Sequence, residues 1–406
     1  MQIQSLHLCV AGLDVHLKLV VVTIIHAPTA DAEPKVETRE FGAFKRDRRA
    51  MAEWIASFHP DEVSMESTGI YWKGVYVALE RVGIRAKVVN AFHVSKVPGR
   101  KTDYSDSLWL AMLTRAGLLK CSFIPDESVR HLRLVSRHHS CMTDDLVSYK
   151  NRLLKVLNDG GMRLTAAVSD AHGVACRAMI KAIVSGQTPE QAVQLAGRLK
   201  SDRDQLILAL DHELTPHHIY MAQAIQRQID FVEQEIAELE RYLYHALTRY
   251  QPLMDLLQTL PGMDRLSIAK LLVEIGPDMS AFPNPDHLAV WSGTSPGNEQ
   301  SADKRKKAKT QRGNHHVRRI LVEVAHAAAR TRCYFKEKFE AWRPRLGYRK
   351  AVVAVAHKII KIVHIMLSRN VPYEDRSADF EALRVSRNRS RWIKALQKHG
   401  HLPETA

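Results

Sequence analysis

The chain has 406 residues, enough for two or three domains with hydrophobic cores of their own. Its contents of 45% hydrophobic and 25% charged residues are ordinary for a globular protein, and its longest apolar runs, 19–25 and 351–356, are too short to cross a bilayer. The five scattered cysteines form no CxxC pair, which argues against a disulfide scaffold or a zinc ribbon. Because the N-terminus also lacks a secretory leader, we expect a cytoplasmic protein with no membrane partner.

The formal net charge of +15 is concentrated in the last quarter of the chain. Residues 301–406 contain 26 Lys and Arg against 9 Asp and Glu, whereas the first 300 residues contain 33 against 35. Solubility alone does not concentrate charge in this way, but a surface that binds a polyanion does. Binding should therefore weaken steeply with salt, with a log–log slope of about −0.9 for each duplex phosphate that is neutralised.

Residues 1–125 are predicted to form an α/β domain. Apolar runs and alternating patterns predict strands at 6–14, 18–25 and 36–44, a helix at 47–58, a buried strand at 62–66, a helix at 72–82 and a strand at 86–90. Three opening strands followed by alternating helices and strands match the order of the ribonuclease H-like fold.

Four acidic residues lie where these strands end or where the next helix begins. Asp14 and Glu66 end predicted buried strands, while Asp103 and Asp106 are three residues apart, on one face of a helical run. Any one of them could be an ordinary surface or capping carboxylate, and Asp103 fits an N-cap. Four acids in one pocket would repel one another unless a cation neutralised them, and oxygen ligands favour Mg²⁺ or Mn²⁺. The sequence therefore predicts a metal site for phosphate chemistry on nucleic acid.

Residues 126–250 are predicted to be helical. One stretch has apolar residues at steps of four and three, a coiled-coil pattern about three heptads long: Ile225, Ile229, Val232, Ile236, Leu239, Leu243 and Ala246. Two interpretations remain open: amphipathic helices that pack on each other within one chain, or helices that pair between chains.

Residues 251–370 are predicted to form a third, mostly helical domain, followed by a basic, weakly periodic tail at 371–406. The turn at 260–262 and the helix at 267–275 resemble a helix-hairpin-helix, in which a glycine such as Gly262 lets backbone N–H groups approach a phosphate. A plain turn is the alternative. A basic loop at 300–314 and helices at 315–332 and 350–367 follow.

The basic loop contains a second candidate centre, Ser301. A serine hydroxyl is a poor nucleophile unless a base, a metal or dense positive charge lowers the cost of its ionisation. Six of the nine residues at 304–312 are cationic and could hold a scissile phosphate. From the residues alone a solvated serine is the simpler interpretation, and Ser292 and Ser295 are competitors. The predicted nucleic-acid-binding residues are Lys304, Arg305, Lys306, Lys307, Lys309, Arg312, Arg318 and Arg319.

At these residues the chain resembles the DEDD transposases of the insertion-sequence one-ten family, whose relatives include Piv-type DNA invertases. The matching stretches are 12–16, 65–72 and 101–106 in the N-terminal half, and 260–262, 293–296, 300–301 and 312–314 in the C-terminal half. Two positions depart from the family pattern, which commonly has glycine in place of Ala302 and an apolar residue in place of Thr294.

The resemblance implies a RuvC-like domain, a helical or coiled-coil region and a mostly α-helical transposase domain. It implies that Asp14, Glu66, Asp103 and Asp106 bind the metal and that Ser301 forms a phosphodiester with DNA. It further implies that a bridge RNA pairs with donor and target DNA, and that a homo-oligomer, dimer or tetramer, combines the acids of one protomer with the serine of another.

Three other classes of protein share some of these features. A RuvC-like junction nuclease would need only the acids and water, so the separate basic domain with Ser301 argues against it. A non-catalytic nucleic-acid-binding protein would not need the four acids. A Piv-like invertase working without RNA would use nearly the same residues, so RNA that copurifies with the protein distinguishes the two.

Overall fold

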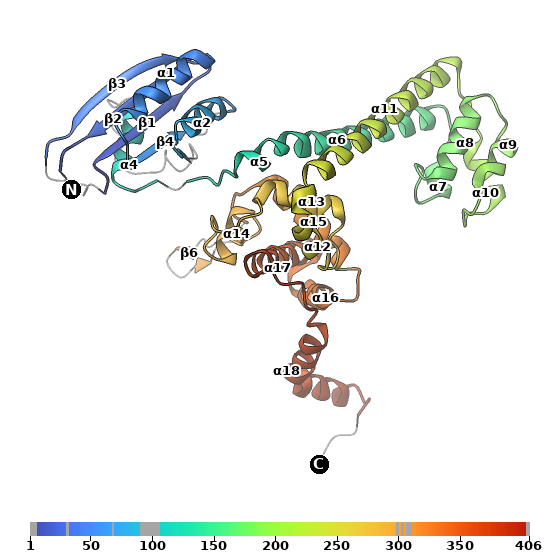
Figure 1. The fold of residues 1–406 in the computed structure, drawn as a ribbon. Coiled ribbons are helices and arrows are strands. Elements are labelled where there is room, and N and C mark those ends of the chain that lie inside the picture. Colours follow the sequence, from blue (N-terminus) through green and yellow to red (C-terminus); the bar gives the residue numbers. More distant parts are fainter. Residues whose placement is uncertain are drawn as a thin grey trace. The chain divides into compact units, whose positions relative to one another are not determined.

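The computed structural model describes residues 6–29, 32–66, 69–89, 106–119, 121–297, 300–301, 304–305 and 310–402. They form two compact units, residues 1–124 and residues 125–406 (Figure 1).

The first unit is built on a five-stranded mixed sheet with the strand order β3-β2-β1-β4-β5. Strand β1 pairs antiparallel with β2 and parallel with β4, β2 pairs antiparallel with β3, and β4 pairs parallel with β5. This topology confirms the predicted ribonuclease H-like order. The elements are β1 (Cys9–Val15), β2 (Leu19–His26), β3 (Lys35–Gly42), α1 (Lys45–Ala56), β4 (Glu62–Glu66), α2 (Trp72–Arg81), β5 (Lys87–Val89) and α4 (Asp106–Arg115).

The alternation of side chains along β1 assigns its two faces to different helices. Ala11, Leu13 and Val15 are buried in one core with residues of α1 and α2. Val10 lies on the other face, in a small cluster with Ala111 of α4. Because successive side chains of a strand point to opposite faces, the even-numbered residues of β1 belong to the α4 face.

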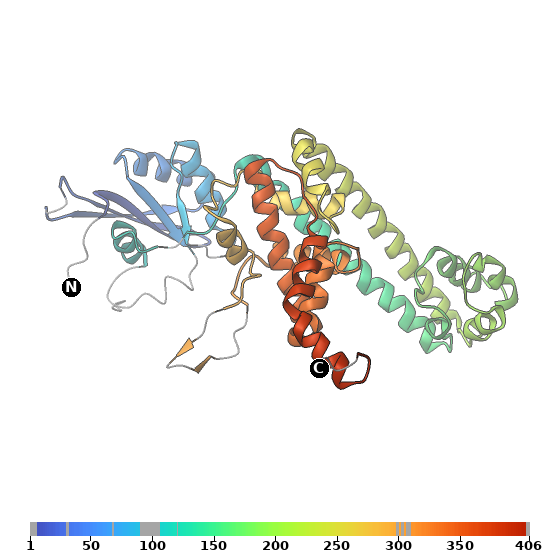
Figure 2. The same ribbon diagram turned by 90° about the horizontal axis from the view of Figure 1, so that it is seen from below.

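The second unit begins with a long helical hairpin. Its helices are α5 (Glu127–Arg130), α6 (Leu132–Asp159) and α11 (Pro216–Ala246), with the small helices α7 (Leu164–Ala167), α8 (Val174–Val184), α9 (Pro189–Val193) and α10 (Arg203–Leu210) between the two long ones. The small helices share one core with the adjoining turns of α6 and α11 (Figure 2). Helix α11 starts at a capping box on Thr215 followed by Pro216, as its sequence favours.

Helices α6 and α11 pack along each other in opposite directions. His139, near the start of α6, lies 3.0 Å from Glu240, near the end of α11, and Leu153 shares a core with Ile225 and Ile229. The apolar faces predicted from sequence are therefore covered within one chain. Pairing between chains stays a prediction.

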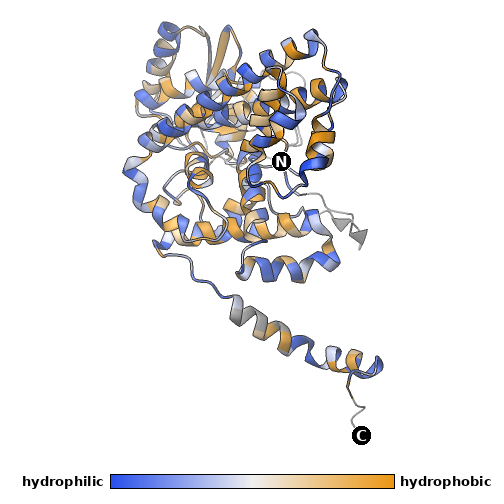
Figure 3. Cartoon of the chain, turned by 90° about the vertical axis from the view of Figure 1, so that its right-hand side faces the viewer, coloured by the Kyte–Doolittle hydropathy of each residue, from blue (hydrophilic) through white to orange (hydrophobic). Residues whose placement is uncertain are grey.

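The remaining helices form a bundle. They are α12 (Gln251–Gln258), α13 (Arg265–Ile275), α14 (Pro285–Trp291), α15 (His315–Ala328), α16 (Tyr334–Leu346), α17 (Tyr348–Arg369) and α18 (Ser377–Lys398). The last of them in the chain, α18, contacts α16. The segment predicted as a weakly periodic tail thus contains a helix. Hydrophobic and hydrophilic residues both occur along α18 (Figure 3), and its Trp392 and Leu396 are exposed.

One helix of the bundle meets the length and composition of a membrane span. Helix α17 is long and apolar enough to cross a bilayer by length and composition, although the apolar run recognised in the sequence was much shorter. Its most apolar window is 56% buried inside the protein, as in the core helix of a bundle. In the described residues no other helix meets that criterion.

The structure shows a packing role for Gly262, while the predicted contact of this turn with a phosphate stays a prediction. Its φ is +85°, and a Cβ added there would lie 2.6 Å from the backbone nitrogen of Ala328 and 2.7 Å from the carbonyl oxygen of Val324. The turn between α12 and α13 is therefore pressed against the backbone of α15, which leaves no room for a phosphate on that side of Gly262.

Gly262→Ala should lower the free energy of unfolding by about 2–6 kcal/mol, because left-handed strain and overpacking each cost about 1–3 kcal/mol. Gly186→Ala is the matched control, because Gly186 has φ +90° with nothing within 4 Å of the added Cβ. Urea denaturation of both variants separates the two contributions. Equal losses of stability would show that the contact with α15 costs nothing.

Candidate active site

Asp14 and Glu66 lie side by side on the α4 face of the sheet. The parallel register of β1 and β4 pairs Leu13 with Met65, so the residues that follow, Asp14 and Glu66, are next in register. Neighbouring strands are about 4.8 Å apart, and residues in register point to the same face. The two carboxylates predicted to act together are therefore neighbours at the end of the two central strands.

Helix α4 crosses this face with its N-terminus toward Asp14. The backbone nitrogen of Leu6, before β1, donates to the carbonyl of Arg115 at the end of α4. Further along β1, Gly12 touches the backbone of Ala111 and Ser107 so closely that a Cβ there would lie 2.3 Å from both. The helix thus runs antiparallel to β1, and its first residue, Asp106, lies at the end of the helix nearest Asp14.

A hydroxyl pair fixes this placement. The Ser107 and Thr23 side-chain oxygens are 2.8 Å apart, and both side chains are fully buried. Thr23 is paired with Gly12 across β1 and β2. A glycine at position 12 is required because α4 approaches the sheet at backbone distance, which brings the Asp106 end of α4 toward the acid edge of the sheet.

The structure thus places three of the four predicted acids, Asp14, Glu66 and Asp106, on one face of one domain, whereas Asp103 lies outside the described residues. Within the described ranges no three potential ligands are close enough together to form a metal site. The donors are all carboxylate oxygens, the ligands that hard divalent cations prefer, so their chemistry fits Mg²⁺ or Mn²⁺, whereas the spacing of the described side chains is too wide to hold an ion.

The Asp14 carboxylate also has a close polar neighbour in the turn after β1. His16 Nε2 lies 3.0 Å from Asp14 Oδ2, and the His16 side chain is 58% exposed while that of Asp14 is 19% exposed. The histidine therefore covers part of the carboxylate from the solvent side; it ends the stretch 12–16 that carries the family resemblance, but no role was predicted for it.

In the second unit, the segment carrying Ser301 projects from a tightly fixed root. Gly293 has φ +72° and lies against Gly313, where a Cβ would approach the Trp291 carbonyl oxygen to 2.5 Å. Gln311 N–H donates to the Ser295 carbonyl at 3.0 Å, and Asn314 N–H donates to that of Trp291 at 2.9 Å. We call the segments 291–296 and 310–314 the hairpin root.

Beyond the root, two short strands form a ribbon. They are β6 (Gln300–Ser301) and β7 (Lys304–Arg305), and Ser301 pairs with Lys304. The backbone of Ser301 is therefore held opposite the backbone of a cationic residue. The side chains of Ser301, Lys304 and Arg305 are not described, and Lys306, Lys307 and Lys309 lie outside the described residues.

The hydroxyl groups of the two competing serines, Ser292 and Ser295, make polar contacts inside the fold. Ser292 is fully buried, and its hydroxyl donates to the carbonyl of Ala289 at 2.8 Å. Ser295 is 7% exposed, with its hydroxyl 3.4 Å from Nδ1 of His357 in α17. Neither hydroxyl is accessible to a DNA phosphate, so the structure disfavours both as nucleophiles.

One of the predicted nucleic-acid-binding residues is already engaged within the protein. Arg319 makes a two-pronged contact with Asp144 of α6, both bonds 2.7 Å long, and a third bond of 3.2 Å to Glu323. The hydrogen bond to Asp144 and then that to Glu323 raise the pKa of Arg319 further. Arg318, beside it on α15, is half-exposed and Arg312 is exposed. Arg319 therefore joins α15 to α6, and its contact with nucleic acid stays a prediction.

A buried acid that no sequence pattern singled out, Glu274, lies near the end of α13. Its side chain is 1% exposed and receives two hydrogen bonds from Arg137 of α6, at 2.8 and 3.0 Å, and one from Asn314 at 2.8 Å. Burial acts to raise its pKa, but Arg137 and Arg133 together lower it below the usual value. The only sequence signal is an acid inside the apolar run of α13.

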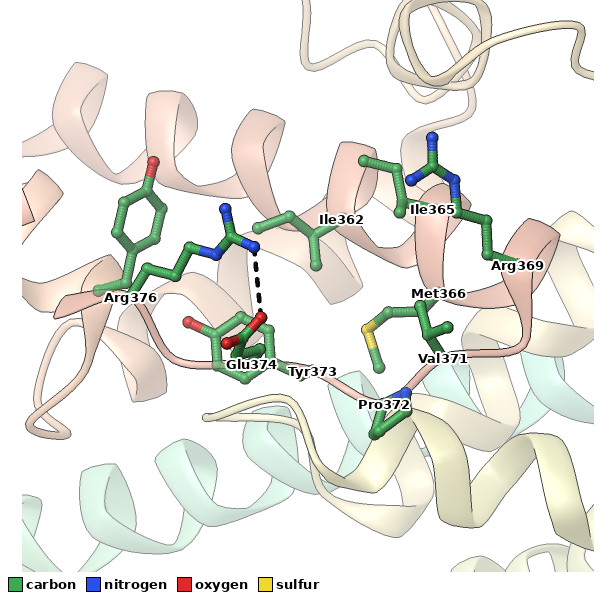
Figure 4. Close-up of a pocket in the computed structure, with 10 residues that line it drawn as sticks. Ile362, Ile365, Met366, Arg369, Val371, Pro372, Tyr373, Glu374 and Arg376 are labelled. Atoms are coloured by element: carbon green, nitrogen blue, oxygen red, sulfur yellow. Dashed lines mark hydrogen bonds and ion pairs between the residues drawn. The ribbon is translucent and has the colours of Figure 1, made fainter. Parts of the chain in front are cut away.

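A separate cavity of about 440 Å³ lies at the C-terminal end of α17 (Figure 4). Apolar side chains line it, among them Ile362, Met366 and Val371. Its one carboxylate, Glu374, is paired with Arg376 at 3.3 Å. With no second acid and no nucleophilic hydroxyl other than tyrosine, this cavity does not have the composition of a centre for phosphoryl transfer.

An acid-edged ribonuclease H-like domain joined to a basic helical unit defines the class of enzymes that act on nucleic acid. Two family models match the chain: the DEDD transposase model of IS110 elements over residues 11–160, and the model described as transposase IS116/IS110/IS902 family over residues 254–340. The chain belongs to the IS110 family of transposases, enzymes that cut and rejoin DNA.

Solved structures similar to the chain include RuvC of Thermus thermophilus, alone and in complex with a Holliday junction substrate. The two are 16% and 15% identical to the chain, and the matches cover 28% and 29% of this chain and 100% of each RuvC chain. Both have a TM-score of 0.23. No curated protein sequence matches the chain significantly.

Proposed function

We propose that this transposase recombines the DNA of its insertion sequence with a target through two centres, the acids of the first unit and Ser301 of the second. The observation that supports it most is the pairing of Asp14 and Glu66 on neighbouring parallel strands, with the Asp106 end of α4 directed toward them. Exposed surface acids do not need such a placement, whereas a shared cation does.

Asp14, Glu66, Asp103 and Asp106 would hold a Mg²⁺ or Mn²⁺ ion. Bound there, the cation would supply Lewis-acid stabilisation of charge on a phosphate oxygen. The contribution of the chain itself is the geometry: β1 and β4 fix two carboxylates about one strand spacing apart, and α4 brings a third from across the face.

Ser301 would act as the nucleophile toward a DNA phosphate. Its Oγ would form a bond to phosphorus, the bond from that phosphorus to one deoxyribose oxygen would break, and that oxygen would leave with a proton as a hydroxyl group. The second strand-exchange step would reverse this, with a hydroxyl of the other DNA displacing the serine. The fixed hairpin root supports this role, because a nucleophile has to be presented in a constant position.

A bridge RNA that pairs with donor and target DNA would supply the sequence choice, with the protomers assembled as a homo-oligomer. The basic second unit supports a polyanion partner, and sequencing of the RNA that copurifies with the expressed protein and its flanking element tests it. One discrete RNA encoded beside the gene is the expected result. Strand exchange by nuclease-treated, RNA-free protein would favour the Piv-like invertase instead.

Arg318→Ala should weaken DNA binding and flatten its salt dependence by about 0.9 in the log–log slope, the effect of losing one phosphate contact. Arg319→Ala is the matched control on the same turn of α15, because its guanidinium is held by Asp144 and Glu323. Fluorescence anisotropy of a labelled duplex over a salt series measures both. A larger change of slope for Arg319 than for Arg318 would contradict this assignment.

A further inference from the structure

Glu274 lies where three elements of the second unit meet. It belongs to α13, its two carboxylate oxygens accept from the Arg137 guanidinium of α6, and one of them also accepts from Asn314 Nδ2 at the start of α15. A carboxylate that is 1% exposed is costly to bury, and the fork of Arg137 compensates that cost with two parallel charge-assisted bonds. The acid therefore joins three elements at one point.

Asn314 is the last residue of the hairpin root and the N-cap residue of α15. Its Oδ1 accepts from the backbone nitrogens of His316 at 3.0 Å and Val317 at 3.3 Å, which leaves its Nδ2 to donate to Glu274. Its own N–H donates to the Trp291 carbonyl across the root. Through this one amide, Glu274 fixes the point from which the Ser301 segment leaves the bundle.

The other side of the contact is the start of α6. Arg133 donates to the carbonyl groups of Val273 and Glu274, and its pKa is lowered to about 10, mainly by burial. Arg133 and Arg137 lie in the first two turns of α6. This helix follows α5, soon after the first unit ends at residue 124. The segment that covalently tethers the acid-bearing unit is thus anchored at the base of the serine-bearing segment.

We propose that Glu274 is a positioning residue for DNA strand exchange: it locks the tether of the acid-bearing unit and the hairpin root into one rigid block. This inference rests on the proposed function of the acids and Ser301. It predicts that removing the charge of Glu274 loosens the hairpin root relative to α6 without changing the affinity for nucleic acid. The reason is that Glu274 is too deeply buried to touch a nucleic acid.

The test uses the full-length chain with nitroxide labels at the native, exposed Cys141 of α6 and at Gln311→Cys of the root, in a Cys9→Ser, Cys121→Ser background. Spin-diluted samples report the distance distribution within one chain. Glu274→Gln keeps the size of the side chain and removes its charge. Asp144→Asn is the matched control, because it also breaks a contact of α6 with α15, but an exposed one of little energetic value.

Glu274→Gln should broaden the distance distribution and slow single-turnover strand exchange by roughly 100-fold, the cost of misplacing a reacting group by about 1 Å, at unchanged affinity for nucleic acid. Asp144→Asn should leave both measurements as in the wild type. Circular dichroism shows whether Glu274→Gln folds. If it does not, Arg137→Lys replaces it, because this variant keeps the buried charges balanced but loses the two parallel hydrogen bonds to Glu274. It should show the same two effects with a smaller magnitude.

A narrow distribution in a folded Glu274→Gln or Arg137→Lys protein would overturn the proposal, as would a broad one with strand exchange at the wild-type rate. The distance measurement does not depend on which serine reacts. If Ser301→Ala still forms protein–DNA adducts, the proposed function fails, while a broadened distribution would still identify Glu274 as the residue that holds the root.

Discussion

Asp14→Asn is expected to lower the rate of strand exchange by at least about 100-fold to 1000-fold, the usual cost of losing one electrostatic group from a phosphoryl-transfer site. Asparagine preserves the size of the side chain, so β1 and its pairing with β4 should be unchanged. Nucleic-acid binding should persist, because the excess of positive charge lies in residues 301–406. Gel assays of strand exchange, beside anisotropy measurements of binding, follow the two properties.

Thermal stability provides a second check on the same variant. Asp14 shares its face with Glu66, so removing one of two neighbouring negative charges should leave the melting temperature unchanged or raise it in metal-free buffer. Glu53→Gln is the control, since Glu53 is an exposed acid of α1 whose partner, Arg49, lies one turn earlier in the same helix. Strand exchange at the wild-type rate in Asp14→Asn would exclude this carboxylate from the chemistry.

The sheet was predictable because its information is local. Alternating and continuous apolar runs define β1, β2 and β4, and the acids that end β1 and β4 mark the edge of the sheet. Once the parallel register of these two strands is known, Asp14 and Glu66 have to be neighbours. The predicted bounds of β4 agree with the observed ones, and those of the other strands differ by a few residues at each end.

The contacts of the second unit were not predictable, because they join residues far apart in the chain. Glu274 and Arg137 are separated by 137 positions, and Arg319 and Asp144 by 175. Nothing local distinguishes Arg319, held by an acid of α6, from Arg318 beside it. A cationic residue in a basic stretch therefore predicts the charge of a surface, and only the packing of α6 against α15 decides which cations that surface can use.

The same limit applies to the three glycines at close backbone contacts. A Pro-Gly turn before a basic loop favours a phosphate contact by composition, but Gly262 is needed because α15 passes within backbone distance. Gly293 and Gly313, by contrast, lie in motifs shared with the family, and their close contact closes the hairpin root. A glycine in a sequence indicates a close approach, and the fold determines which group approaches.

Ser301→Ala is expected to abolish the covalent protein–DNA adduct and strand exchange together, a loss of roughly a millionfold where a serine is the nucleophile. The physical reason is that alanine has no oxygen with which to form the phosphodiester. Because the substitution lies beyond the hairpin root, the stability of the bundle should be unchanged. Denaturing gels of protein incubated with labelled DNA detect the adduct directly.

Ser292→Ala and Ser295→Ala are the matched controls, since they remove the two nearest competing hydroxyls of the same segment. Both should still form the adduct, but Ser292→Ala should lower the free energy of unfolding by about 1–3 kcal/mol, because the Thr294 hydroxyl loses a buried partner 2.9 Å away. If adducts persist in Ser301→Ala and disappear in Ser295→Ala, the nucleophile is Ser295 of the hairpin root and not Ser301. The His357 ring beside Ser295 would then be the first candidate for its base.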